Sequence, residues 1–135
     1  MTDKELLELA AKAAGGFVYV ENMGWITQDA DGNRGSWWKP LEDDGDTLRL
    51  AVKLRMDIYA LSNGCEARSG SINHEISEIA KDDDLCAATR RAIVRAAAGV
   101  GKKMLSHDEF ILMFHGRFDE ETVERAAAAI GKAMP

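Results

Sequence analysis

The segment Leu85–Met104 constrains the fold of this chain more than any other part of the sequence. Its small and aliphatic residues recur at helical spacing and form one flat face, made of Ala87, Ala88, Ile93, Val94, Ala97, Ala98 and Gly101. Three consecutive aspartates precede it at 82–84. Small side chains let a helix lie close to its neighbour, so the segment predicts a long helix packed against a sheet or a second helix.

Shorter segments rich in β-branched and aromatic residues predict strands elsewhere in the chain. The expected strands are 17–21, 25–28, 36–39, 57–62 and 65–68. The pair Asn63 and Gly64 indicates a hairpin with positive φ between the last two strands. The segment 72–80 has apolar residues at both strand and helix spacing, and we favour the strand.

Two further helices are expected in the first half of the chain. Thr2 is the expected cap of a helix over 2–14, with Glu5 as its capping-box partner. A second helix over about 47–55 follows a cluster of aspartates whose carboxylates suit the free N–H groups of a helix start. Together the elements predict an α+β fold, in which a mostly antiparallel sheet is layered with helices as a two- or three-layer sandwich.

The length of 135 residues predicts one domain with a short appendage. We expect an α+β domain over 1–104 and a C-terminal extension over 105–135 that packs on the same domain. Within the extension, the sequence EFILMFH predicts a buried strand over 109–115, and 119–134 predicts a final helix.

The charge balance limits the kinds of partner. With 17 basic and 23 acidic residues the net charge is −6, which argues against direct nucleic-acid binding, because that binding depends on Lys and Arg neutralising phosphates. No apolar run approaches the roughly 20 residues that cross a membrane. The N-terminus has acids among its leucines, unlike a signal peptide. We therefore expect a cytoplasmic protein without a membrane partner.

The stretch RGSWWKPLEDDGD, residues 34–46, is the most suggestive part of the sequence. Pro40 and the aspartates at 43, 44 and 46 fit the end of a strand and the start of a helix. Neighbouring residues of a strand point to opposite faces, so one of Trp37 and Trp38 is expected in the core while the other points away and is either exposed or, in a three-layer fold, buried by another layer. An exposed tryptophan beside charged residues is typical of an interface anchor.

No catalytic, cofactor or metal site is expected. The segment 29–33 resembles a calcium loop, but the twelfth position from Asp29 is Pro40 instead of the required glutamate. The three histidines have no zinc-ligand spacing, and a Cys–His pair from Cys65 or Cys86 is not required by the sequence. The basic residues of the long helix, Arg90, Arg91, Arg95, Lys102 and Lys103, are interpreted as a solvated helix face.

Three stretches resemble a family of small phage and prophage proteins described as a phage ABA-sandwich domain. They are MTDKELLELAAKAAG, WWKPLEDDGDTLRLAVKLRM and DDDLCAATRRAIVRAAAGVGKKM, which contain the matching positions Trp38, Pro40, Leu41, Asp43, Asp44, Gly45, Asp46 and 88–96. The resemblance covers about residues 1–103. It implies a phage or prophage origin and a layered fold of helices and strands, and it transfers no catalytic residue.

The resulting expectation is a non-enzymatic phage accessory protein that binds a host protein. A defence system of the CRISPR kind is one such target, inhibited by occlusion or by acidic mimicry facing a basic, nucleic-acid-binding complex. The expected partner-binding residues are Trp37, Trp38, Asp43, Asp44, Asp82 and Asp83. A self-associating structural or regulatory phage protein, such as a homodimer, is the alternative, and a small hydrolase or nuclease is the third.

Overall fold

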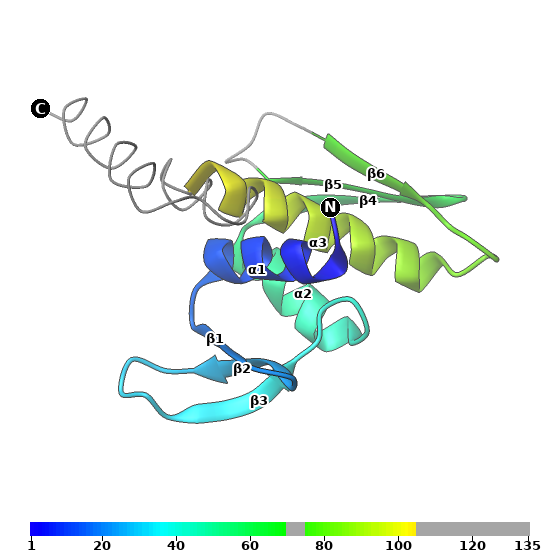
Figure 1. Ribbon diagram of the computed structural model, residues 1–135. Helices are drawn as coiled ribbons and strands as arrows, with labels where there is room; N and C mark the ends of the chain where they lie inside the picture. Colours follow the sequence, from blue (N-terminus) through cyan, green and yellow to red (C-terminus); the bar gives the residue numbers. More distant parts are fainter. Residues whose placement is uncertain (70–74, 105–135) are drawn as a thin grey trace, which may run out of the picture. The chain divides into compact units, whose positions relative to one another are not determined.

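The computed structural model describes residues 1–69 and 75–104 (Figure 1). The chain divides into two compact units, Met1–Gly101 and Lys102–Pro135. The strand and helix expected at 109–115 and 119–134 lie outside the described residues, so the packing of the extension on the domain stays a prediction.

Three helices and six strands follow one another in the described part of the chain. They are α1 (Asp3–Ala14), β1 (Phe17–Val20), β2 (Gly24–Gln28), β3 (Arg34–Trp38), α2 (Asp44–Lys53), β4 (Met56–Leu61), β5 (Gly64–Ser69), β6 (Glu75–Ile79) and α3 (Leu85–Met104). The α+β class is confirmed. The strand favoured over 72–80 is present as β6, and 72–74 fall outside the description.

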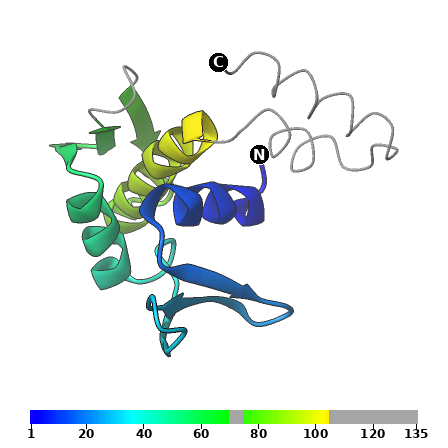
Figure 2. The same ribbon diagram turned by 90° about the vertical axis from the view of Figure 1, so that its left-hand side faces the viewer.

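The strands form two antiparallel sheets, β1-β2-β3 and β4-β5-β6, instead of one. Pro40 cannot donate to a ladder, and α2 then separates β3 from β4, so the two meanders do not join. Figures 1 and 2 show the two sheets on opposite sides of the helices. None of the described helices is long and apolar enough to span a membrane.

Local sequence signals fix the helix starts. The Thr2 hydroxyl accepts a hydrogen bond from the backbone N–H of Glu5 at 3.2 Å, as the capping box predicts. The Asp43 carboxylate accepts from the N–H of Asp46 at 2.8 Å and caps α2. With Asp43 as its cap, α2 begins at Asp44, three residues before the predicted start at 47.

The β4–β5 hairpin corrects the predicted turn. Leu61 pairs with Gly64, so Ser62 and Asn63 form the two-residue loop, and none of these four residues has a positive φ. Gly64 is required for another reason: a Cβ there would collide with the backbone carbonyl of Glu78 in β6. The hairpin signal was right about the turn and wrong about its backbone conformation, because sheet packing and not φ selects this glycine.

The core lies where α1, α3 and β5 meet. α3 buries most of the predicted face, namely Ala88, Ile93, Val94, Ala97, Ala98 and Gly101, whereas Ala87 is only partly buried. Ala92 and Ala96, which the prediction left out, are buried as well, at 0% exposure. Cys65, Ala67 and Ser69 alternate along β5 and are likewise fully buried. α1 and α3 lie side by side in both views (Figures 1 and 2), which matches the close backbone contact of Gly101 with Leu9.

Candidate functional site

The two adjacent tryptophans of β3 have opposite environments. Trp38 is 4% exposed and its ring stacks on Phe17 of β1, with centroids 4.1 Å apart and planes at 20°. Trp37 is 40% exposed. The prediction that one tryptophan is core and the other points away is confirmed, since strand neighbours face opposite sides of the sheet.

Pairing across the sheet gathers the aromatic residues on one face. Trp25 lies opposite both Tyr19 and Trp38, and directly opposed residues of an antiparallel sheet share a face. The Tyr19 and Trp25 rings are 5.4 Å apart. Lys4 of α1 places its ammonium 5.3 Å from the Tyr19 ring centroid, so the aromatic face lies next to α1.

The opposite face of the same sheet carries an apolar row. Val18, Ile26 and Trp37 are in register across β1, β2 and β3. The register then shifts beyond Ile26, where the Thr27 hydroxyl accepts from the N–H of Ser36 at 3.0 Å. The irregularity falls on the segment of β3 that precedes the tryptophans.

A pocket of about 440 Å³ lies beside these tryptophans. Its wall is mainly apolar and also contains four charged residues, Asp3, Lys39, Glu42 and Arg91. It is lined by Asp3, Leu7, Met23, Gly24, Trp25, Trp37, Trp38, Lys39, Leu41, Glu42, Ala87 and Arg91, which come from α1, α3, the β1–β2 turn and the chain around β2 and β3. We call this site the tryptophan pocket.

One polar contact joins two walls of the tryptophan pocket. Arg91 of α3 donates to the carboxylate of Asp3 at the start of α1, at 3.0 Å. Both side chains are partly exposed, at 41% and 63%. The pair therefore contributes little stability as an exposed bridge, but it fixes the position of two charges at the pocket edge.

Most of the acids singled out by the sequence serve the start of α2. Asp43 caps the helix, and Asp46 accepts from the N–H of Lys39 at 2.9 Å and from Arg49 at 2.7 Å. Thr47 is buried and donates its hydroxyl to the carbonyls of Pro40 and Asp43. Asp43 and Asp46 of RGSWWKPLEDDGD thus act at the start of the helix, while Trp37 remains available at the surface.

The six expected partner-binding residues lie in three places. Trp37 and Trp38 belong to the tryptophan pocket. Asp43 and Asp44 are at the start of α2, where Asp44 pairs with Arg90 at 2.6 Å. Asp82 and Asp83 are exposed in the turn before α3, with φ of 54° and 60°. The structure does not bring these acids into the tryptophan pocket.

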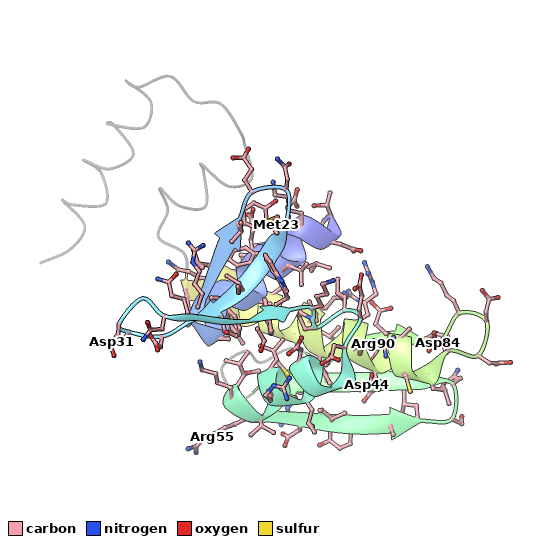
Figure 3. The ribbon with its side chains drawn as sticks, turned by 90° about the horizontal axis from the view of Figure 1, so that it is seen from below. Met23, Asp31, Asp44, Arg55, Asp84 and Arg90 are labelled. Carbon is pink, nitrogen blue, oxygen red and sulfur yellow. The ribbon has the colours of Figure 1, made fainter. Side chains whose placement is uncertain are left out.

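The arginines of α3 correct the interpretation of a solvated helix face. Arg90 donates to Asp44 and, at 3.0 Å, to the carbonyl of Leu41 (Figure 3 shows Arg90 beside Asp44). Arg95 donates to Glu78 of β6 at 2.6 Å. With Arg91 on Asp3, each arginine joins α3 to a different element. Their partners are 17 to 88 residues away in sequence, so local pattern could not show them.

The tryptophan pocket also includes residues that sequence reasoning did not select. Trp25, Met23 and Leu7 line it but stand in different predicted elements. For Trp25 the sequence signal is the hairpin register that sets it opposite Trp38, and this register is visible only once the turn length is known. Met23 and Leu7 carry no such signal.

The cysteines are in contrasting environments. Cys65 is fully buried in β5, whereas Cys86 is exposed in the first turn of α3. Burial raises the pKa of the Cys65 thiol above its ordinary value, partly offset by a hydrogen bond with Thr89 and reinforced by the charge of Glu66. The three histidines lie outside the described residues, so a Cys–His pair is not addressed. Within 1–69 and 75–104, no group of three or more potential ligands is placed to hold a metal.

No family model, curated protein or solved structure matches this chain, so the resemblance to phage proteins stays a prediction.

Proposed function

We propose that this chain is a protein-binding module of phage or prophage origin, which attaches to a host protein through the exposed Trp37 and the tryptophan pocket beside it. The observation that carries the proposal is Trp37, which is 40% exposed on the face of the sheet opposite Trp25 and Trp38 and borders the tryptophan pocket that those two line. Tryptophan is one of the residue types enriched among the side chains that contribute most to binding at protein interfaces. The pocket would receive an apolar side chain of the partner.

The charges of the pocket suit a partner segment that combines an apolar anchor with polar ends. Asp3 and Glu42 supply carboxylates, and Lys39 and Arg91 supply cations. Since Asp3 and Arg91 already pair with each other, the anchoring energy would come from apolar burial, and the charges would set orientation.

Acidic mimicry is a weaker form of the proposal. Asp43 and Asp44 are held by contacts within the chain, and only Asp82 and Asp83 are carboxylates of the expected set with no such contact in the described structure. The net charge of −6 still favours a basic partner surface, which nucleic-acid-binding defence complexes expose. An inhibitor acting in the host cytoplasm fits this description, with Trp37 as the anchor.

Affinity capture from a bacterial host lysate tests the proposal. The intact chain should retain a specific partner, and Trp37→Ala should lose it while remaining folded. Ile79→Ala is the matched control, because Ile79 is a large apolar residue, 68% exposed, on the other sheet. Retention of the same partner by the Trp37→Ala protein would contradict the proposal.

A further inference from the structure

The four sheet edges of the described chain differ in how they are protected. An edge strand presents unpaired N–H and C=O groups, and natural proteins protect edges with short strands, bulges or charges. β1 has four residues, β3 carries a register shift against β2, and β6 has two glutamates in its sequence EISEI. β4 is neither short nor bulged: its six residues, MDIYAL, pair with β5 without interruption and include a single charge.

β4 is also apolar on both of its faces. Ile58 is 38% exposed, Tyr59 50% and Leu61 40%. The one charged residue of the strand is Asp57, which lies directly opposite Arg68 of β5, a neutralising cross-strand pair. An edge with this composition favours pairing with a further strand.

A groove of about 420 Å³ continues the apolar surface from β4 onto the helices. Ile58 lines it together with Leu48 of α2 and Leu85 of α3, which are 60% and 44% exposed. Its polar end is the ion pair of Asp44 with Arg90. A strand added to β4 would therefore find both free backbone groups and an apolar groove next to them.

We propose that β4 pairs antiparallel with β4 of a second copy of this chain, which joins the two β4-β5-β6 sheets into one. A twofold axis perpendicular to the joined sheet keeps the same face of both copies on one side. Directly opposed residues of antiparallel strands share a face, so the axis must lie at a residue and not between two residues. With the axis at Tyr59, Ile58 lies opposite Ala60 of the second copy, and Asp57 lies opposite Leu61 of the second copy. No like charges face each other in this register.

The same reasoning disfavours the opposite edge. β6 is one residue shorter than β4, and its Glu78 is held by Arg95 of α3, so a β6 junction would bring the ion pairs of two copies together. The longer and more apolar β4 is therefore the better self-pairing edge. Because the tryptophan pocket is built on the other sheet, the dimer would carry two of them and could bind a repeated partner with increased avidity.

Sedimentation of the full chain over a wide concentration range is the first test. The wild-type protein is expected to approach twice the mass of the chain as concentration rises. Tyr59→Lys should raise the dissociation constant at least about tenfold, because it places two ammonium groups near the axis. The fold should tolerate this change, since Tyr59 is half exposed and lies opposite Glu66 in β5. Ile79→Lys on β6 is the matched control and should leave the association unchanged.

Cross-linking distinguishes the β4 junction from any other interface. In a Cys86→Ser background, Tyr59→Cys should give a covalent dimer with a short bismaleimide, and Ile79→Cys should not. The proposal would be overturned if the wild-type chain stayed monomeric over the whole concentration range. Coverage of β4 by another segment of the same chain would give that result. A dimer that Tyr59→Lys leaves intact or that Tyr59→Cys fails to cross-link would also overturn the proposal.

Discussion

Gly101 of α3 lies so close to Leu9 of α1 that a Cβ at position 101 would collide with the backbone carbonyl of Leu9. The two helices therefore meet backbone to backbone. Their separation also sets the shape of the tryptophan pocket, because Leu7 of α1 and Ala87 of α3 both line it. A change in this contact is expected to reach both stability and the site.

Gly101→Ala is expected to lower the free energy of unfolding by about 1–3 kcal/mol, the usual cost of overpacking a tight core. Gly45→Ala is the control, because a Cβ there meets only the side-chain ends of Arg49 and Asp43. Urea denaturation monitored by circular dichroism compares the two. Equal effects would show that α1 and α3 are not in backbone contact.

The two tryptophans of β3 should separate stability from binding. Trp38→Ala removes a buried ring stacked on Phe17 and should cost about 3–5 kcal/mol of unfolding free energy. Trp37→Ala removes a ring that is 40% exposed and should cost less than about 1.5 kcal/mol. Chemical denaturation measures both. A larger loss for Trp37→Ala than for Trp38→Ala would mean that the inward and outward assignments are reversed.

The parts of the fold that sequence could predict are those with a local physical cause. Thr2 and Asp43 cap helices because short polar side chains reach the free N–H groups three residues on. The opposite faces of Trp37 and Trp38 follow from the period of a strand. These relations involve neighbours in the chain, so a single sequence contains them.

Features that depend on distant partners could not be predicted. The sequence shows that Arg91 is on a helix, but not that Asp3, 88 residues away, receives its hydrogen bond. The division of the strands into two sheets depends on where α2 packs, and Trp25 joins the tryptophan pocket only through the β2–β3 register. Local pattern predicts elements, whereas the site is made by their packing.

The ion pair of Glu78 with Arg95 should contribute measurably because Glu78 is only 18% exposed and also lies 3.7 Å from Arg91. Glu78→Gln is expected to lower the unfolding free energy by about 1 kcal/mol, with a smaller loss in high salt. A double-mutant cycle with Arg95→Gln should give a coupling of about 0.5–1 kcal/mol. A coupling free energy of zero would mean that the ion pair of Glu78 with Arg95 does not stabilise the fold.

The buried thiol of Cys65 should make stability depend on alkaline pH. Burial raises the folded-state pKa of the Cys65 thiol above its ordinary value, so the folded chain keeps this proton at a pH where the unfolded chain loses it. The contribution is full below about pH 9 and is lost as pH rises through the folded pKa. Cys65→Ala should therefore show a shallower loss of stability between neutral and strongly alkaline pH than the wild type.

Thiol labelling gives an independent check on the same residue. Cys86 is exposed and should react with a thiol reagent in the folded protein, whereas Cys65 should react only on unfolding. Equal reaction rates of the two thiols in the native chain would contradict the burial of Cys65.

Substitution should separate Asp43, which stabilises the start of α2, from Asp82 and Asp83, which do not stabilise the fold. Asp43→Ala should cost about 1 kcal/mol, because it removes the α2 cap. Asp82→Gly and Asp83→Gly should preserve or raise stability, because both residues have a positive φ that glycine adopts without strain. Thermal unfolding checks all three, and a loss with the glycine variants that matches Asp43→Ala would give those aspartates a structural role.

The affinity of a captured partner for the tryptophan pocket tests the central claim most directly. Titration calorimetry with the purified partner should show that Trp37→Ala weakens binding by about 30-fold or more, as expected for an anchor worth at least about 2 kcal/mol. Ile79→Ala should bind as the wild type does. Unchanged affinity of a folded Trp37→Ala protein would contradict the account and place the binding surface elsewhere on the chain.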